Sequence, residues 1–266
     1  MNSKKYLHFL GTGHAHVTRC YNTCFLINID DHLFLTDAGG GNQILYQLEK
    51  SNISLTDIHH MFISHSHTDH ILGAIWVIRL YGTSITKGNL QPLHIYGNKD
   101  VIQKIRCICE ALIQPSYIEF FDNQIIFHVL KDKDTLKLWN CKFTFFDIKC
   151  VTTPQLGYEL VFTNKKRLVF CGDEPFRLKP FDYIKDADWV IYENTTVYYD
   201  EEFAHIHSST KEGCILAEKA DIKNFILTHT EDFKLKTRKN TICSLGKQFF
   251  SGNLYCPDDF DTIFLE

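Results

Sequence analysis

The stretch "SHSHTDH" at residues 64–70 gathers three histidines and an aspartate directly after the apolar run "MFI". A short apolar run of this kind predicts a buried strand, which would deliver the polar side chains at its end. Imidazole and carboxylate groups are the usual ligands of zinc sites that keep a position open for water. The stretch therefore predicts a metal site.

The spacing within this stretch points to more than one ion. Alternate residues of an extended chain point the same way, so His65 and His67 are expected to converge on one ion. Asp69 and His70 are offset from them and are expected to face a second ion. A zinc site takes about four ligands, so the rest of the chain has to supply the remainder.

The composition suits a globular protein with a buried core, since 44% of the 266 residues are hydrophobic and 23% are charged. The formal net charge of −4 gives no overall attraction to nucleic acid or to an anionic membrane. The basic stretches at 163–167 and 233–239 are interpreted as solvated loops. No apolar stretch reaches the length of a membrane span, so no membrane partner is expected.

Ten cysteines occur in the chain, and none of them forms a CxxC pair. A chain of this length that begins with a short polar lead instead of a signal peptide is expected to keep its thiols reduced. The predicted location is therefore cytoplasmic.

Apolar strand patterns come first in each half of the chain and helical patterns follow, which predicts an α/β (α+β) fold of two packed sheets with outer helices. The chain is expected to form a single domain over 1–266, with a cover segment around 83–140. The expected strands are 6–10, 22–29, 32–37, 58–64, 92–97, 142–148, 158–163, 167–173, 188–193 and 224–230. Helices are expected from 42 to 49 and over 71–81, 99–112 and 209–220.

Six short motifs, taken in order, resemble those of the metallo-β-lactamase fold metallo-hydrolases over nearly the whole chain. They are "LGTG" (10–13), "TDAGGG" (36–41), "SHSHTDHILG" (64–73), "LGYEL" (156–160), "FCGDEP" (170–175) and "LTHT" (227–230). The resemblance implies a four-layer αββα sandwich of two mixed β-sheets, with metals at one edge. Within the superfamily, the motifs are most similar to those of the ribonuclease Z-like phosphodiesterase branch.

The resemblance also implies a set of six metal ligands. They are His65 and His67 in the first site, Asp69, His70 and His229 in the second, and Asp173 as a bridge between both. Asp37, in "TDAGG", resembles a residue that orients a ligand histidine, as metal-bound imidazoles usually require. The alternative for Asp37 is an ordinary turn aspartate, and both interpretations stay open.

One ligand of the family pattern is absent from this chain. The family places a histidine a few residues before its "GY" segment, and the expected position falls near Val151, where no histidine occurs. Cys150, as a thiolate, is chemically the best substitute, although it also fits a buried thiol without a metal. His14 and His16 are further alternatives. We therefore expect either one bound ion or two ions bound with unequal affinity. The expected ion is zinc, with Mn2+ or Fe2+ as alternatives.

A second constellation joins "YENTT" (192–196) to "HIHSST" (205–210). It resembles the relay of the ribonuclease Z-like branch, in which a glutamate orients a histidine that donates a proton to the leaving oxygen. Glu193 and His207 take these positions, since a carboxylate on one imidazole nitrogen fixes the tautomer and raises the pKa. The alternative is that Glu193 is solvated and His207 merely precedes a helix cap. His205 is interpreted as a surface residue.

These motifs predict a metal-dependent hydrolase in which a metal-bound hydroxide attacks a phosphodiester. Asp69 would accept or hold the proton of that nucleophile. The expected substrate is a small molecule or a short nucleic acid, such as a nucleotide, an RNA 3′ end or a small phosphoester. Lactone, thioester or amide hydrolysis, and a metal-binding scaffold without activity, are the alternatives. Homodimer formation stays open.

Overall fold

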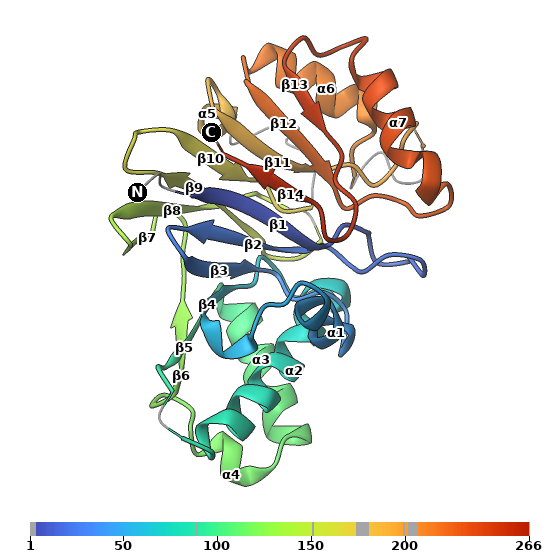
Figure 1. The fold of residues 1–266 in the computed structure, drawn as a ribbon. Coiled ribbons are helices and arrows are strands. Elements are labelled where there is room, and N and C mark those ends of the chain that lie inside the picture. The colour runs from blue at the N-terminus through green and yellow to red at the C-terminus, as the bar shows by residue number, and fades with distance from the viewer. Residues whose placement is uncertain are drawn as a thin grey trace. The chain divides into compact units, whose positions relative to one another are not determined.

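The computed structural model describes residues 4–88, 90–150, 152–173, 181–198, 200–201 and 207–265. Contacts divide the chain into two compact units. The first consists of Met1–Gly11, Tyr21–Leu130 and Asp259–Glu266, and the second of Thr12–Cys20 and Lys131–Asp258. Each unit holds one sheet and its own helices (Figure 1).

The sheet of the first unit has seven strands in the order β14-β1-β2-β3-β4-β5-β6. Strands β14, β1, β2 and β3 pair antiparallel, whereas β3 to β6 pair parallel. Strands β2 and β3 form a hairpin that turns at Asp30 and Asp31, which both have positive φ. The strands are β1 (Lys5–Gly11), β2 (Cys24–Ile29), β3 (His32–Thr36), β4 (Ile58–Phe62), β5 (Leu93–Gly97), β6 (Ile125–Val129) and β14 (Thr262–Phe264).

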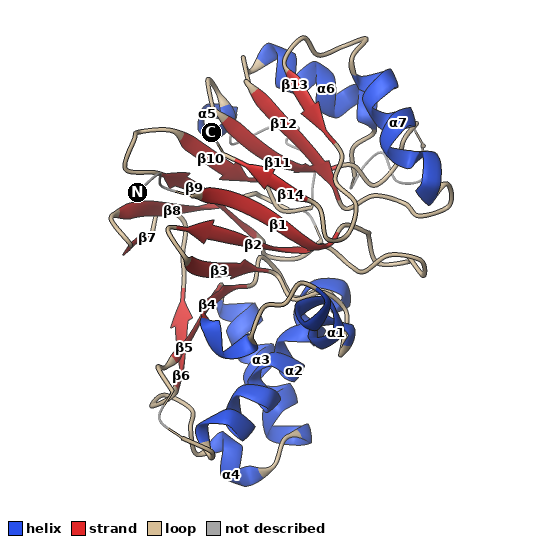
Figure 2. Ribbon diagram, in the orientation of Figure 1, coloured by secondary structure: helices blue, strands red, loops and turns tan. Residues whose placement is uncertain are grey.

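Helices cover one face of this sheet, as Figure 2 shows for α1, α2 and α3. The helices are α1 (Gln43–Lys50), the 3-10 turn η1 (Leu55–Asp57), α2 (Thr68–Ile85), α3 (Lys99–Leu112) and α4 (Pro115–Ile118). The start of α2 is fixed by backbone contact. Gly73 donates to the carbonyl of Gly39 at 2.9 Å, and a Cβ at Gly73 would lie 1.8 Å from the carbonyl oxygen of Ala38. Only glycine permits this approach, and it holds the second turn of α2 against the segment that follows β3.

The second unit repeats this plan with a sheet of order β13-β12-β11-β10-β9-β8-β7. Strands β7 to β10 pair antiparallel and β10 to β13 parallel. The strands are β7 (Thr135–Leu138), β8 (Cys141–Asp147), β9 (Leu156–Val161), β10 (Arg167–Phe170), β11 (Trp189–Glu193), β12 (Asn224–Thr228) and β13 (Asn253–Tyr255). The helices are α5 (Phe181–Ile184), α6 (Thr210–Lys219) and α7 (Leu235–Gly246).

Parallel strands decide where the polar motifs of the second unit lie. Because β10, β11 and β12 run in the same direction, their carboxyl ends meet at one edge of the sheet. Glu193 ends β11, His229 follows β12, and Asp173 follows β10 by three residues. Helix α6 begins just beyond, with a capping box between Ser209 and Glu212.

The predicted architecture of mixed sheets with helices is confirmed, and every expected strand and helix is present within a few residues. One interpretation is wrong: 233–239 is not a solvated loop, because α7 begins at Leu235 and the side chain of Arg238 is buried. Residues 83–140 contribute strands and helices to the units, and their role as a cover stays a prediction. Among the described residues all ten cysteines are free thiols, as expected. Nor does this part of the chain contain a helix of the length and hydropathy that a membrane crossing needs.

Candidate active site

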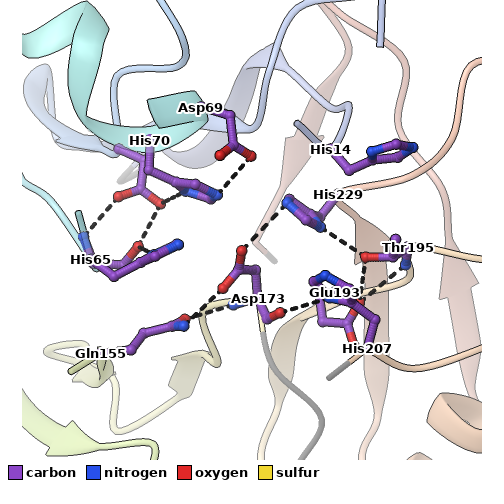
Figure 3. Close-up of polar contacts among 12 residues, drawn as sticks. His14, His65, Asp69, His70, Gln155, Asp173, Glu193, Thr195, His207 and His229 are labelled. Carbon is purple, nitrogen blue, oxygen red and sulfur yellow. Dashed lines mark hydrogen bonds and ion pairs between the residues drawn. The ribbon is translucent and has the colours of Figure 1, made fainter. Parts of the chain in front are cut away.

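The first unit brings the side chains of the opening stretch together between the end of β4 and the start of α2. The ring centroids of His65 and His70 are 4.1 Å apart, and those of His65 and His67 are 4.6 Å apart. Asp69 Oδ2 lies 3.3 Å from His70 Nε2 (Figure 3). His65, Asp69 and His70 are buried, whereas His67, at the N-cap of α2, is exposed.

Asp37 orients two of these histidines. Its fully buried carboxylate accepts from the backbone N–H of Ser64 at 2.7 Å, from Ser64 Oγ at 2.9 Å and from His70 Nδ1 at 2.8 Å. Ser64 Oγ also lies 2.9 Å from His65 Nδ1. A hydroxyl has one proton, and Ser64 donates it to Asp37, so it accepts from the Nδ1–H of His65. Both histidines therefore carry the proton on Nδ1 and present Nε2.

In the second unit, Asp173 is held by an amide that the sequence did not point to. Gln155 Nε2 donates to Asp173 Oδ1 at 2.8 Å, and the backbone N–H of Asp173 donates to Gln155 Oε1 at 2.8 Å. Gly172 makes this arrangement possible, because its φ is +68° and a Cβ there would lie 2.0 Å from Gln155 Oε1. The only hint in the sequence is the glycine of "CGD", which permits a left-handed backbone.

His229 is oriented through a hydroxyl. Thr195 Oγ1 lies 3.0 Å from Glu193 Oε2 and 3.0 Å from His229 Nδ1. Because the carboxylate of Glu193 can only accept, Thr195 donates to it and accepts from the Nδ1–H of His229. His229 therefore presents Nε2, which lies 3.4 Å from Asp173 Oδ2. The sequence pattern indicates neither Thr195 nor Ser64, because a hydroxyl gains this role only from its neighbours in space.

Glu193 and His207 are brought together as predicted, and Glu193 is fully buried, so the solvated alternative is wrong. His207 Nδ1 lies 3.6 Å from Glu193 Oε2 and donates to the backbone carbonyl of Asp173 at 3.1 Å. Glu193 also accepts from the backbone N–H groups of Thr195 and Ser208. Burial lowers the pKa of His207, but the carboxylates of Glu193 and Asp173 outweigh it and raise the pKa above the usual histidine value.

The two units share one arrangement: a buried carboxylate orients one imidazole directly and a second through a hydroxyl. In the first unit the carboxylate is Asp37, and in the second it is Glu193. Oriented imidazoles with Nε2 presented, together with nearby aspartates, are a donor set that suits a divalent cation. Ligand atoms of Glu193, His207 and His229 also lie within 4.8 Å of one another. Glu193, however, is engaged by Thr195 and Ser208, so we assign it to orientation instead of ligation.

All three predicted substitutes for the absent histidine, Cys150, His14 and His16, lie in the second unit. Cys150 is half-buried, its Sγ lies 3.2 Å from Thr152 Oγ1, and it does not join the group of potential ligand atoms in the described part of that unit. His14 lies beside His229, with ring centroids 6.1 Å apart, and its Nδ1 accepts from the backbone N–H of His16. Ligation by any of these residues stays a prediction. The position of Val151 and the side chain of His205 lie outside the described residues.

Comparison with known proteins identifies relatives along most of the chain. A family model described as Anti-Pycsar protein Apyc1 matches residues 5–249. Ribonuclease Z of Bacteroides fragilis is 34% identical over 134 residues, which cover 48% of this chain and 40% of that protein. The chain thus spans about two fifths of the length of that relative. Ribonuclease Z of Prochlorococcus marinus (strain MIT 9515) is 26% identical over 96% of this chain and 97% of its own.

Solved structures show the same fold. The metallo-β-lactamase fold protein YhfI from Bacillus subtilis superposes with a TM-score of 0.79 at 17% identity, covering 99% of this chain and 100% of that one. The short form of human tRNase Z superposes with a TM-score of 0.73 at 19% identity, and the match covers 98% of this chain and 99% of that one. The predicted metallo-β-lactamase fold and the resemblance to ribonuclease Z-like proteins are therefore confirmed.

Proposed function

We propose that this chain, which belongs to the Anti-Pycsar protein Apyc1 family, is a metal-dependent phosphodiesterase. The observation that carries the proposal is the position of His207 against the buried carboxylate of Glu193, with a raised pKa. An imidazole held in this way binds its proton more strongly than a free histidine and can donate it to a leaving group. Phosphodiester hydrolysis with an alkoxide leaving group requires such a donor.

The same proposal assigns the metal ligands as the motifs imply. They are His65, His67, Asp69, His70, Asp173 and His229. These residues would hold a divalent cation, zinc or alternatively Mn2+ or Fe2+, which would supply a nucleophile near neutral pH by lowering the pKa of a coordinated water and would offset charge on the phosphate. Whether one or two ions bind depends on what replaces the absent histidine near Val151.

The chain's own residues then have separate roles. Asp69 accepts the proton of the attacking water and holds it in line. The backbone carbonyl of Asp173, which accepts from His207 Nδ1, keeps the proton there while the ring is neutral. The carboxylate of Glu193 stabilises the cationic ring, which donates from Nε2 to the leaving oxygen. Gln155 fixes the carboxylate of Asp173 through its amide. The proposed substrate is a nucleotide, an RNA 3′ end or a small phosphoester, in keeping with relatives named Ribonuclease Z.

The test compares leaving groups. His207→Ala is expected to slow a diester with an alkoxide leaving group by about 10²- to 10⁴-fold. It should slow the p-nitrophenolate ester much less, since p-nitrophenolate leaves without a proton. Asp69→Ala is expected to abolish turnover of both esters, and His32→Ala, at an exposed histidine, serves as the control.

Three outcomes would contradict the proposal. Equal loss with both leaving groups would remove His207 from the role of proton donor. Turnover of a lactone or thioester but of no phosphodiester would favour the other hydrolase class. No turnover of any substrate by metal-loaded protein would favour a scaffold. A homodimer and a cytoplasmic location stay predictions from the sequence.

A further inference from the structure

Arg238 is a buried cation near the start of α7, and its side chain is 2% exposed. A guanidinium group stays charged inside proteins, and the helix dipole disfavours a cation at this end of a helix. Replacing buried ion pairs with apolar side chains is often neutral or stabilising. Stability alone therefore does not account for an arginine at this position, and its contacts have to explain it.

The guanidinium group of Arg238 joins segments of the second unit that lie far apart in the sequence. Nη2 donates to Thr12 Oγ1 at 3.0 Å and to Asp258 Oδ1 at 2.9 Å, and Nη1 donates to Cys20 Sγ at 3.9 Å. A planar guanidinium serves several acceptors at fixed angles, which the ammonium of lysine does not reproduce. Arg238 therefore holds both ends of the segment 12–20 against α7.

The segment 12–20 is attached in turn to the residue that follows His229. The backbone N–H of Thr230 donates to the carbonyl of Thr12 at 3.0 Å, and the N–H of His14 donates to the carbonyl of Thr230 at 3.2 Å. These two bonds form an isolated parallel bridge. They place His14 beside His229, as Figure 3 shows. Both backbone groups of Thr230 are therefore fixed by this segment.

His229 needs a fixed neighbour because its own backbone is left-handed, with a φ of 56°. Such a conformation is uncommon for residues other than glycine, and it persists only where the surrounding structure determines it. Thr195 orients the imidazole through Nδ1, but it does not fix the backbone that carries the ring. The bridge at Thr230 supplies that second restraint.

We propose that Arg238 is a positioning residue of the candidate active site, an inference that rests on the proposed role of His229 as a metal ligand. By holding both ends of the segment 12–20, Arg238 fixes the partner with which Thr230 pairs. That pairing keeps the backbone of His229 in the conformation that presents Nε2, which lies 3.4 Å from Asp173 Oδ2. Arg238 acts through this connection and not by contact with metal or substrate.

The first test measures zinc affinity in competition with a chromogenic chelator. Arg238→Met keeps a long side chain but donates no hydrogen bond. It is expected to weaken zinc binding by about 10- to 100-fold, the usual result of losing a group that orients a metal ligand. Thr12→Val removes the acceptor and keeps the arginine, so it should act in the same direction. Should Arg238→Met fail to fold, Thr12→Val decides the question.

Arg167→Met is the matched control. Arg167, at the start of β10 in the same unit, donates to Glu159 Oε1 at 2.7 Å and to the backbone carbonyls of Tyr183 at 2.7 Å and Lys185 at 2.9 Å. It is thus a second arginine that joins separate segments, but none of these acceptors belongs to the segment 12–20 or adjoins His229. Its loss should lower the melting temperature and leave zinc affinity unchanged.

Rescue by free guanidinium ion separates positioning from a general structural role. Arg238 lines a pocket of about 160 Å³, so Arg238→Ala opens the position of its guanidinium group to small solutes. Guanidinium at millimolar concentration should restore part of the zinc affinity that Arg238→Ala loses. Urea, which is neutral but has a similar planar shape, should restore less because it lacks the charge that Asp258 pairs with.

Four outcomes decide the inference. Wild-type zinc affinity in both Arg238→Met and Thr12→Val would overturn it, and so would an equal loss in Arg167→Met. Guanidinium that raises the melting temperature of Arg238→Ala without raising its zinc affinity would also overturn it. Absence of zinc binding by the wild-type protein would refute the ligand role of His229 and this inference with it. Zinc binding that depends on Arg238, without turnover of any phosphodiester, would support the positioning role and refute the proposed function alone.

Discussion

Thr195→Val tests whether a hydroxyl orients a metal ligand in the second unit. Valine keeps the shape of threonine but cannot accept from His229 Nδ1 or donate to Glu193 Oε2, each 3.0 Å away. Without a metal, the buried imidazole of His229 can relieve the loss by moving its proton to Nε2. A bound cation forbids this, because it needs the lone pair of Nε2. The penalty therefore falls on the metal-bound state.

The magnitude follows from two independent ranges. A buried N–H left without an acceptor costs about 1–3 kcal/mol, which corresponds to about 5- to 150-fold in affinity. Removing the group that orients a ligand histidine usually costs about 10- to 100-fold. We therefore expect Thr195→Val to weaken zinc binding by about 10- to 100-fold.

The assay is a zinc titration in competition with a chromogenic chelator, with thermal unfolding of the metal-free protein as a check on folding. Thr228→Val is the matched control, because Thr228 is equally buried and its hydroxyl makes no hydrogen bond to a described residue. Equal affinities of the two variants would refute the role of Thr195. A loss confined to the stability of the metal-free protein would refute the assignment of the penalty to the bound state.

Three further predictions concern Ser64, Gly172 and His60. Ser64→Ala should weaken zinc binding by about 10-fold or more, measured in the same titration, because His65 loses its acceptor; wild-type affinity would contradict this. Gly172→Ala should lower the free energy of unfolding by at least about 1–2 kcal/mol in denaturant titrations, since its φ is +68° and the new Cβ would displace Gln155; unchanged stability would show that this segment relaxes. Burial and the neighbouring His94 lower the pKa of His60 from 6.5 to about 4. As the pH falls, the unfolded chain therefore takes up this proton before the folded chain does. The free energy of unfolding that His60 contributes above about pH 6.5 should accordingly fall toward pH 4. Melting temperatures across that range should fall less in His60→Gln than in the wild-type protein. An identical pH profile of the two would refute the attribution of this pH dependence to His60.

The sequence was sufficient to predict a structural element or a site residue where the pattern that indicates it lies within a short segment. The apolar run before His65 predicted a strand over 58–64, where β4 (Ile58–Phe62) lies, and the helix predicted over 71–81 lies within α2 (Thr68–Ile85). Glu193 and His207 were paired from motif resemblance, and they lie 3.6 Å apart. In each case a short segment carries both the structural and the chemical information.

The sequence was insufficient where a role depends on pairing between distant segments. Gln155 holds Asp173 because β9 pairs with β10, and nothing in the letters around Gln155 indicates that contact. Residues 233–239, which include the start of helix α7, were interpreted as a basic loop because their charged side chains obscure the pattern of buried positions. Arg238 can be buried there because Thr12 and Asp258, which lie elsewhere in the sequence, accept hydrogen bonds from its guanidinium group.

The backbone at two candidate site residues has a consequence for selection experiments. Asp37 and His229 each follow the last residue of a strand, with φ of 54° and 56°. This left-handed conformation costs most residues about 1–2 kcal/mol, and asparagine, aspartate and histidine tolerate it better, but glycine adopts it most readily. A library enriched only for thermal tolerance would therefore accept glycine at 229 and lose the imidazole. Directed evolution of this protein needs a functional readout at every round, because stability and the site make opposite demands on the same residue.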